Sequence, residues 1–336
     1  MSTRQTRGIF KVAIIGCGRI AGSKDTPHVK GNVATHAQAF HRDARFTLAA
    51  VVDRRQKQTR YFTRVWKSAS GYTSLKELLR REKLDVISLC TPNGLHAKQI
   101  EEILLVERGP RIIFAEKPVC LTREELNRLI QLEKKSSCRV IVNHTRRFDP
   151  AHIRLSGLIS QGSLGRFMGG ACVYYGGWLN NGCHMVDTLR MLFGVEPIIA
   201  SSNYGPKGRG ADRCLDVTLL FSGAAVLING FDELYYQISE MELRFAKGRV
   251  LIRDFGSDIV IEKVKVNSLR ERVLCPYPGS PLTGLDSPLL RAVNVIAHYL
   301  EKGAAVRING VSLKDSAKTM EILWQAQELA RKKDGK

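Results

Sequence analysis

Three glycines near the beginning of the chain resemble a phosphate-binding turn. Gly16, Gly18 and Gly22 form a G-x-G-x-x-x-G run, one residue longer than the G-x-G-x-x-G motif, directly after the apolar run at 12–15. In this motif the glycines allow a tight turn and a close approach of the backbone to a pyrophosphate. A helix that follows such a turn directs its first N–H groups at the phosphates. The motif therefore predicts a dinucleotide site, with a helix directly after it.

An acidic residue at the end of the next apolar run supports this interpretation. Asp53 is placed to accept a hydrogen bond from a ribose 2′-hydroxyl. The gap between Gly22 and Asp53 exceeds the usual spacing of about 20 residues, which predicts an insertion at 23–33. A carboxylate repels a 2′-phosphate and favours NAD, whereas Arg54 and Arg55 offer positive charge that could accept one. The sequence favours NAD and leaves NADP open.

The first part of the chain alternates short apolar runs with amphipathic stretches, the rhythm of β-α-β units. Five runs lack polar alternation and are predicted as strands buried on both faces: 12–16, 48–53, 85–90, 111–116 and 139–144. Helices are predicted between them at 74–82, 96–107 and 122–136. Thr122 and Glu125 form a capping box at the start of the last helix. This pattern predicts a doubly wound parallel Rossmann sheet.

The pattern changes after Pro150, where longer segments with alternating polarity predict a largely antiparallel sheet. Further helices are predicted at about 289–302 and from about Ser312. We therefore expect an α/β protein of two domains. Residues 1–149 form the dinucleotide-binding Rossmann domain, and residues 150–336 form an α+β domain for substrate binding and oligomerisation.

Four ordered motifs resemble those of the Gfo/Idh/MocA family of sugar-type oxidoreductases. They are TPNGLHAKQIEEIL at 91–104, AEKPVCLTREEL at 115–126, NHTRRFDP at 143–150 and GGWLNNGCHMVDTLRMLFG at 176–194. The second motif contains E-K-P at the end of a Rossmann strand, the hallmark of the family. The fourth resembles its G-x-H-x-x-D block. The phrases THA and LNNGCH resemble members linked to bacterial surface-polysaccharide and nonulosonic-acid biosynthesis.

Lys117 and His184 fall at the catalytic positions that this resemblance implies. Lys117 follows a buried strand at the carboxyl edge of the sheet, and would hydrogen-bond the reacting oxygen and stabilise developing negative charge. His184 would accept the hydroxyl proton, because an ordinary histidine has a pKa of about 6.5. The resemblance also implies a cis peptide before Pro118. Many relatives carry an aspartate four residues before this histidine, where this chain has Asn180, which cannot ionise.

The glycine motif and the resemblance together assign both binding sites. The cofactor is assigned to Gly16, Gly18, Arg19, Ile20, Gly22, Asp53, Arg54, Thr91, Pro92, Asn93, His96, Glu116 and Lys117. The substrate is assigned to Lys117, Asn143, Arg146, Trp178, Asn180, Asn181 and His184. For Arg146, a structural salt bridge is an equally good interpretation. For Trp178, packing is an alternative, because it is the commoner role of aromatic residues on strands. Cys183 is not expected to act as a nucleophile, because neighbouring side chains point apart.

The composition of the 336 residues is that of a folded globular protein, with 44% hydrophobic and 25% charged residues. No apolar run approaches the ~20 residues of a membrane span, and the N-terminus does not resemble a signal peptide, so we expect a cytoplasmic protein. The eight cysteines have no metal-ligand spacing, so we expect reduced thiols and no metal. A net charge of +20 suits an acidic partner, although no helix-turn-helix or basic arm is evident.

These observations favour an NAD(P)-dependent oxidoreductase that transfers hydride between the nicotinamide and a secondary alcohol or ketone of a sugar or nucleotide sugar. One alternative is a redox-neutral glycosidase or lyase of the same fold, which uses tightly held NAD. Another is a non-catalytic, cofactor-sensing regulatory protein, although Lys117 and His184 together argue against it. We expect a homodimer or homotetramer that binds a small sugar and neither nucleic acid nor membrane.

Overall fold

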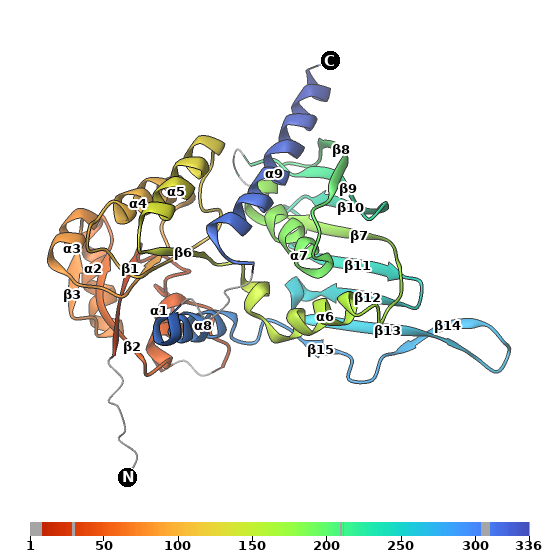
Figure 1. The fold of residues 1–336 in the computed structure, drawn as a ribbon, viewed down its shortest axis with the longest axis horizontal. Helices are drawn as coiled ribbons and strands as arrows, with labels where there is room; N and C mark the ends of the chain where they lie inside the picture. Colours follow the sequence, from red (N-terminus) through yellow and green to blue (C-terminus); the bar gives the residue numbers. More distant parts are fainter. Residues whose placement is uncertain (1–8, 29–30, 209, 211, 304–309, 336) are drawn as a thin grey trace, which may run out of the picture. The chain divides into compact units, whose positions relative to one another are not determined.

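The computed structural model describes residues 9–28, 31–208, 210, 212–303 and 310–335. The chain divides into two compact units (Figure 1). The first comprises Met1–Phe148 and Ser287–Ser316, and the second comprises Asp149–Asp286 and Ala317–Lys336. The first boundary lies one residue before the predicted one. The division is otherwise less simple than predicted, because a later segment returns to the first unit.

Helix α8, Pro288–Lys302, is the returning segment. Its buried residues recur at helical spacing and form one apolar stripe: Leu289, Ala292, Val293, Ile296, Ala297 and Leu300. This stripe belongs to the same hydrophobic core as Phe40, Phe46 and Phe114 of the first unit. Helix α8 packs beside α1, as Figure 1 shows. Burial of this stripe explains why the helix joins the first unit and not the second.

The first unit contains a parallel sheet of six strands in the order β3-β2-β1-β4-β5-β6. The strands are β1 Phe10–Ile15, β2 Phe46–Val52, β3 Ser70–Tyr72, β4 Val86–Leu89, β5 Ile112–Ala115 and β6 Arg139–Val142. The five predicted strands and their parallel arrangement are confirmed. The sequence missed β3, because this strand has three residues, including a glycine, and no apolar run.

The other helices of the first unit are α1 His36–Arg42, α2 Gln56–Trp66, α3 Leu75–Arg81, α4 His96–Leu104 and α5 Arg123–Lys135. Short 3₁₀ turns occur at Asn93–Leu95 and Thr145–Phe148. The capping box of α5 is confirmed, with the Glu125 amide donating to Thr122 Oγ1 over 3.2 Å. Each predicted helix of this unit forms, with ends that differ by a few residues.

The helix expected directly after the glycine motif does not form there. Residues 19–24 form a turn, and α1 begins only at His36. Gly22 explains the interruption, because its φ of +125° lies outside the helical region. The chain then follows the insertion predicted from the long gap before it enters α1.

The second unit contains a nine-stranded sheet in the order β14-β13-β12-β11-β7-β10-β9-β8, with β15 paired to β13. All neighbours are antiparallel except β7 and β10. The strands are β7 Phe167–Tyr175, β8 Ile198–Tyr204, β9 Leu215–Phe221, β10 Ala224–Phe231, β11 Glu240–Phe245, β12 Gly248–Arg253, β13 Asp258–Val266, β14 Arg272–Pro276 and β15 Leu282–Thr283. The predicted, largely antiparallel sheet is confirmed.

Helices α6 Pro150–Ser160, α7 Cys183–Phe193 and α9 Leu313–Asp334 accompany this sheet. Phe193 at the end of α7 packs on one face of the sheet, with ring centroids 4.5 Å from Phe167 and 4.7 Å from Phe221. None of the helices in the described part of the chain has the length and apolar character that a membrane crossing requires.

Candidate cofactor site and catalytic residues

Two glycines of the motif are required by the protein's own packing. Gly16 has a φ of +87°, and a Cβ there would lie 2.9 Å from the backbone of Cys90. Gly22 has a φ of +125°, and its Cβ would lie 3.0 Å from the Trp66 ring. Gly18 differs, because a Cβ at this position would meet no atom within 4 Å. The small size of Gly18 is therefore not explained by a protein neighbour, and it suits close approach by a ligand.

Asp53 follows β2 and lies beside the glycine turn. Its Oδ2 accepts a hydrogen bond from the Cys17 amide over 3.1 Å. Its Oδ1 accepts from the Arg55 amide at 2.9 Å and from Arg55 Nε at 3.2 Å. Partial burial would raise the pKa of Asp53, but the hydrogen bonds from Arg55 lower it below its ordinary value. Asp53 is thus an ionised carboxylate, and the Arg55 side chain is committed to it.

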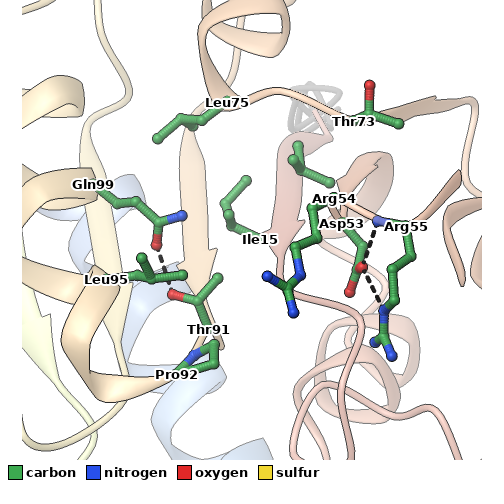
Figure 2. A pocket seen from close by; sticks show the side chains of 12 residues that line it. Ile15, Asp53, Arg54, Arg55, Thr73, Leu75, Thr91, Pro92, Leu95 and Gln99 are labelled. Atoms are coloured by element: carbon green, nitrogen blue, oxygen red, sulfur yellow. Dashed lines mark hydrogen bonds and ion pairs between the residues drawn. The ribbon is translucent and has the colours of Figure 1, made fainter.

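A pocket of about 360 Å³ opens beside this carboxylate (Figure 2). It is lined by Ile15, Gly16, Val52, Asp53, Arg54, Arg55, Thr73, Leu75, Thr91, Pro92, Leu95 and Gln99. Figure 2 shows the side chains of Ile15, Leu75 and Leu95 around it, and the Arg54 guanidinium directed toward it. Arg54 has no hydrogen bond or ion pair within the described ranges. The pocket therefore combines apolar walls with one carboxylate and one uncommitted cation.

Five residues assigned to the cofactor line this pocket: Gly16, Asp53, Arg54, Thr91 and Pro92. Gly18, Arg19 and Ile20 lie on the glycine turn and Asn93 begins the 3₁₀ turn, none of them lining the pocket. The sequence missed the apolar walls. Thr73 and Leu75 follow β3, which was not predicted. Leu95 and Gln99 lie in the motif at 91–104, in which only polar residues and Pro92 had been assigned to the cofactor.

His96 does not line the pocket, contrary to its assignment to the cofactor. Its side chain is fully buried, and both ring nitrogens bond backbone carbonyl oxygens. Its assignment as a direct cofactor contact is therefore corrected.

Glu116 and Lys117 follow β5 at the carboxyl edge of the same sheet. Glu116 Oε1 accepts hydrogen bonds from Asn143 Nδ2 at 2.6 Å and from His36 Nε2 at 2.9 Å. Asn143 is buried, so its amide is directed at Glu116 within the protein. The peptide between Lys117 and Pro118 is cis, as the resemblance implied. Lys117 itself is partly exposed at this edge.

The fully buried His36 and the partly buried Glu116 carboxylate form a charged pair. Burial would raise the pKa of Glu116, but the hydrogen bond from His36 lowers it. Burial would lower the pKa of His36, but Cys90 and Glu116 raise it to about 10. Both directions favour the ion pair at neutral pH. The sequence singled out THA only as a resemblance and assigned no role to His36, because nothing in its neighbours along the chain reveals the carboxylate.

His184 is the second residue of α7 in the second unit, and it is partly exposed. Asn180 lies in the π-helical turn Trp178–Gly182, which runs directly into α7. Asp212 holds the start of this turn, accepting hydrogen bonds from the amides of Leu179 at 3.0 Å and Asn180 at 2.8 Å. The sequence missed Asp212, which comes from a distant loop. Its carboxylate supports the helical segment that carries His184.

Trp178 was assigned to the substrate, and this assignment is wrong. Its side chain is 0% exposed, and its Nε1 donates to the Leu323 carbonyl over 3.0 Å. The ring packs against Tyr174 in the core, with centroids 5.8 Å apart. Cys183 is also buried, and its thiol donates to the Asn180 carbonyl over 3.1 Å. Both residues have structural contacts.

Arg146 and Asn181, which were assigned to the substrate, and Asp187, which was not, have different surroundings. Arg146 is buried within the 3₁₀ turn of the first unit. Asn181 lies in the π-helical turn beside Gly176, where a Cβ would be 2.7 Å from Asn181 Nδ2. Asp187, which follows His184 by three residues, accepts from Thr319 Oγ1 at 3.0 Å and lies 3.7 Å from Arg190. Asp187 therefore stabilises the contact between α7 and α9.

Residues 10–144 match the model of the oxidoreductase family with an NAD-binding Rossmann fold, Gfo/Idh/MocA. Oxidoreductase P35 of Formosa agariphila is 26% identical over 152 residues, 45% of this chain and 43% of that protein. Myo-inositol 2-dehydrogenase of Thermotoga maritima is 22% identical over 157 residues, 47% of this chain and 42% of that protein. These matches span about two fifths of the length of the curated relatives.

Solved structures match both units. KijD10, a 3-ketoreductase from Actinomadura kijaniata in complex with NADP, has a TM-score of 0.75 at 16% identity, over 96% of this chain and 98% of that chain. The WlbA dehydrogenase of Bordetella pertussis, in complex with NADH and UDP-GlcNAcA, has a TM-score of 0.74 at 21% identity, over 96% and 97%. This likeness establishes the fold. Residues 10–144 are similar to the NAD-binding Rossmann domain of the Gfo/Idh/MocA oxidoreductase family.

Proposed function

We propose that this protein is an NAD(P)-dependent oxidoreductase acting on a CH–OH group or ketone of a sugar or nucleotide sugar. The observation that carries the proposal is the arrangement of the first unit. The glycine turn, Asp53 and Lys117 all follow strands at the carboxyl edge of one parallel sheet, where ligands of open α/β folds bind. Relatives named as a myo-inositol dehydrogenase and a D-glucoside 3-dehydrogenase support this reaction class.

The described residues fit a dinucleotide. The uncrowded backbone at Gly18 would receive the pyrophosphate, and the Asp53 carboxylate would accept a hydrogen bond from a ribose hydroxyl. The apolar pocket beside Asp53 would hold the adenine ring. When bound, NAD(P) supplies the acceptor or donor of hydride.

Lys117 and His184 are the proposed catalytic residues. The Lys117 ammonium would hydrogen-bond the reacting oxygen and stabilise negative charge on it. The His184 imidazole would accept the hydroxyl proton during oxidation and return it during reduction. The two residues come from different units of the chain. We expect both to be needed for turnover and neither to be essential for cofactor binding, although Lys117 is also one of the residues assigned to the cofactor.

The substrate is proposed to be a nucleotide-linked or acidic sugar of surface-glycan synthesis. The WlbA structure contains UDP-GlcNAcA, and a curated relative of Actinomadura kijaniata is a 3-reductase of a dTDP-linked sugar. The net charge of +20 suits a substrate that carries phosphate or carboxylate groups. The fold does not identify this substrate class, since one fold hosts enzymes with many different substrates.

The test is a panel of free sugars, inositols and nucleotide sugars incubated with NAD⁺ or NADP⁺. A substrate should produce nicotinamide absorbance, and its product should be two hydrogens lighter by mass spectrometry. Lys117→Ala and His184→Ala should each retain NADH binding and lose about 10²- to 10⁴-fold in turnover. The exposed residues Lys98 and His41 provide matched controls, Lys98→Ala and His41→Ala, which should remain active.

Two outcomes would contradict this proposal. Cleavage or elimination of a sugar without net change in nicotinamide absorbance would indicate a redox-neutral glycosidase or lyase. NADH binding without any turnover across the panel, and with no effect of Lys117→Ala, would favour a cofactor-sensing role. Turnover near that of the unmodified protein in either variant would remove that residue from the reaction.

A further inference from the structure

Both chain neighbours of Lys117 are held by buried histidines. Glu116, which precedes Lys117, is bonded by His36, and Pro118, which follows it, is bonded by His96. Each histidine is the first residue of a helix, α1 for His36 and α4 for His96. Both side chains are 0% exposed. This arrangement lies entirely within the first unit.

His36 joins β4 to the residue before Lys117. Its Nε2 lies 2.9 Å from Glu116 Oε1, and its Nδ1 lies 2.7 Å from the hydroxyl of Ser88 on β4. The ring also packs against Phe114 of β5, with centroids 5.0 Å apart. His36 therefore fixes the Glu116 carboxylate relative to two neighbouring strands.

His96 joins the exit of β4 to the residue after Lys117. Its Nδ1 lies 2.8 Å from the Pro118 carbonyl oxygen, and its Nε2 lies 2.7 Å from the Thr91 carbonyl oxygen. A carbonyl oxygen only accepts hydrogen bonds, so each of these bonds requires an N–H on the ring. The two ring nitrogens thus connect the Thr91 carbonyl to the Pro118 carbonyl.

Both bridges end at or just after β4, which lies inside the sheet between β1 and β5. A central strand is a rigid reference, whereas a lysine side chain has many rotamers and depends on its backbone for direction. Fixing the groups on both sides of Lys117 limits rotation of the backbone that carries it. The entropy of placing the ammonium is then lost on folding and not during the reaction.

We propose that His36 and His96 are positioning residues that hold Lys117 from its two sides. The inference rests on the proposed function only for what Lys117 does there. It assigns no contact with cofactor or substrate to either histidine. Thr91 also lines the pocket beside Asp53, so the His96 bridge connects that pocket to the turn that carries Lys117.

Amide hydrogen exchange followed by mass spectrometry tests the proposal without a substrate. His36→Gln and His96→Gln should each speed exchange in the segment 116–121 by about tenfold or more, the effect of leaving buried polar groups without their hydrogen-bond partner. Exchange in β1 should not change. His41→Gln is the matched control, since His41 is exposed on the same helix as His36. NADH affinity should remain within about threefold in all three variants.

Unchanged exchange at 116–121 in the folded His36→Gln and His96→Gln variants would overturn the proposal. If a glutamine variant does not fold, Ser88→Ala and His96→Asn replace it, because Ser88→Ala removes only the far end of the His36 bridge. Nitrogen NMR of ¹⁵N-histidine protein gives an independent test for the unmodified chain. A ring N–H on His96 that is protected from exchange supports the proposal, and the absence of any protected ring N–H contradicts it.

Failure of the proposed function would have a different signature. If no sugar is turned over but exchange responds to His36→Gln and His96→Gln, the positioning of Lys117 stands and the reaction assignment does not. If sugars are turned over and exchange does not respond, the reverse holds.

Discussion

Asp53 and Arg54 are adjacent residues with opposite effects on a nucleotide that carries a 2′-phosphate. The Asp53 carboxylate repels such a phosphate, and the Arg55 side chain that could offset this charge is already bonded to it. Arg54 is directed at the pocket but is exposed, so screening by water weakens its attraction for a 2′-phosphate. The balance of these charges favours NAD over NADP.

We expect NADH to bind at least about tenfold more tightly than NADPH, because a like charge at close range costs more than an exposed cation returns. Asp53→Asn should narrow this preference, and Arg54→Ala should weaken NADPH binding without changing that of NADH. Fluorescence titration of both nucleotides measures the ratio. A tenfold preference for NADPH in the unmodified protein would show that Arg54 outweighs Asp53.

The ion pair of buried His36 and partly buried Glu116 makes stability depend on pH. Cys90 and Glu116 raise the pKa of His36 from 6.5 to about 10 against the effect of burial. A raised pKa contributes stability that is complete below the unfolded value and is lost as pH rises toward the folded value. The folded state holds one more proton than the unfolded state in this interval, so the free energy of unfolding falls with pH.

The stabilisation of the unmodified protein over His36→Gln should therefore shrink between about pH 6.5 and 8.5, by at most about 1.4 kcal/mol per pH unit. Urea denaturation of both proteins across this range gives the difference. His41→Gln should parallel the unmodified protein, since its side chain is exposed. A constant or increasing difference would mean that His36 is neutral in the folded protein.

At the scale of elements, the segment before His184 is the informative one. Residues Trp178–Gly182 form a π-helical turn that continues into α7, so positions 180 and 184 are separated by about one turn of continuous helical backbone. The sequence was compatible with one helical turn between residues 180 and 184, but it did not establish that this segment is helical. The Asp212 carboxylate, which holds two amides of the turn, stabilises it.

Asn180→Asp should raise the pKa of His184, because a carboxylate one turn away favours the protonated imidazole. If His184 is the base, the acid limb of the pH profile for alcohol oxidation should move to higher pH. The measurement is the rate of oxidation against pH for both proteins. An unchanged acid limb in an active Asn180→Asp enzyme would exclude this coupling, and His184→Asn would show whether His184 titrates at all.

Elements with strong local signals were predictable, and elements defined by distant contacts were not. The buried strands and the capping box of α5 follow from apolar runs and from Thr122 and Glu125. The return of α8 depends on its stripe meeting the core around Phe40, which lies some 250 residues earlier in the chain. Trp178 was misassigned because its motif suggested a ligand, whereas its burial depends on contact with α9.

The candidate site shows the same division. The glycine motif, Asp53 and Lys117 could be located from spacing and resemblance, because each follows a strand in a recognisable phrase. His36 could not be assigned, since its partners Ser88 and Glu116 lie on other elements. The part of the pocket lined by Thr73 and Leu75 was not predicted, because both residues follow β3, whose local signal is weak.

At the scale of the whole molecule, the sheet of the second unit has two different faces. Val226 and Ile228 of β10 are buried on one face, whereas Leu227 between them is 51% exposed on the other. Leu227 pairs in register with Ala171 of β7. Ala171 lines a hollow together with apolar residues such as Val173 and Leu251 and with charged residues such as Glu242 and Arg253. An exposed face with this apolar content favours association with another subunit.

We expect the protein to form a homodimer or homotetramer through this face. Two-fold association brings the same face of two subunits together, so a charged residue at its centre would lie close to the same charged residue of the other subunit and be repelled by it. Leu227→Asp should therefore shift the protein toward the monomer without unfolding it, because the side chain is not part of the core. Light scattering at micromolar concentration measures both states, with Leu227→Asn as the uncharged control. A monomer in the unmodified protein would contradict the expectation, and an unchanged oligomer in Leu227→Asp would place the interface elsewhere.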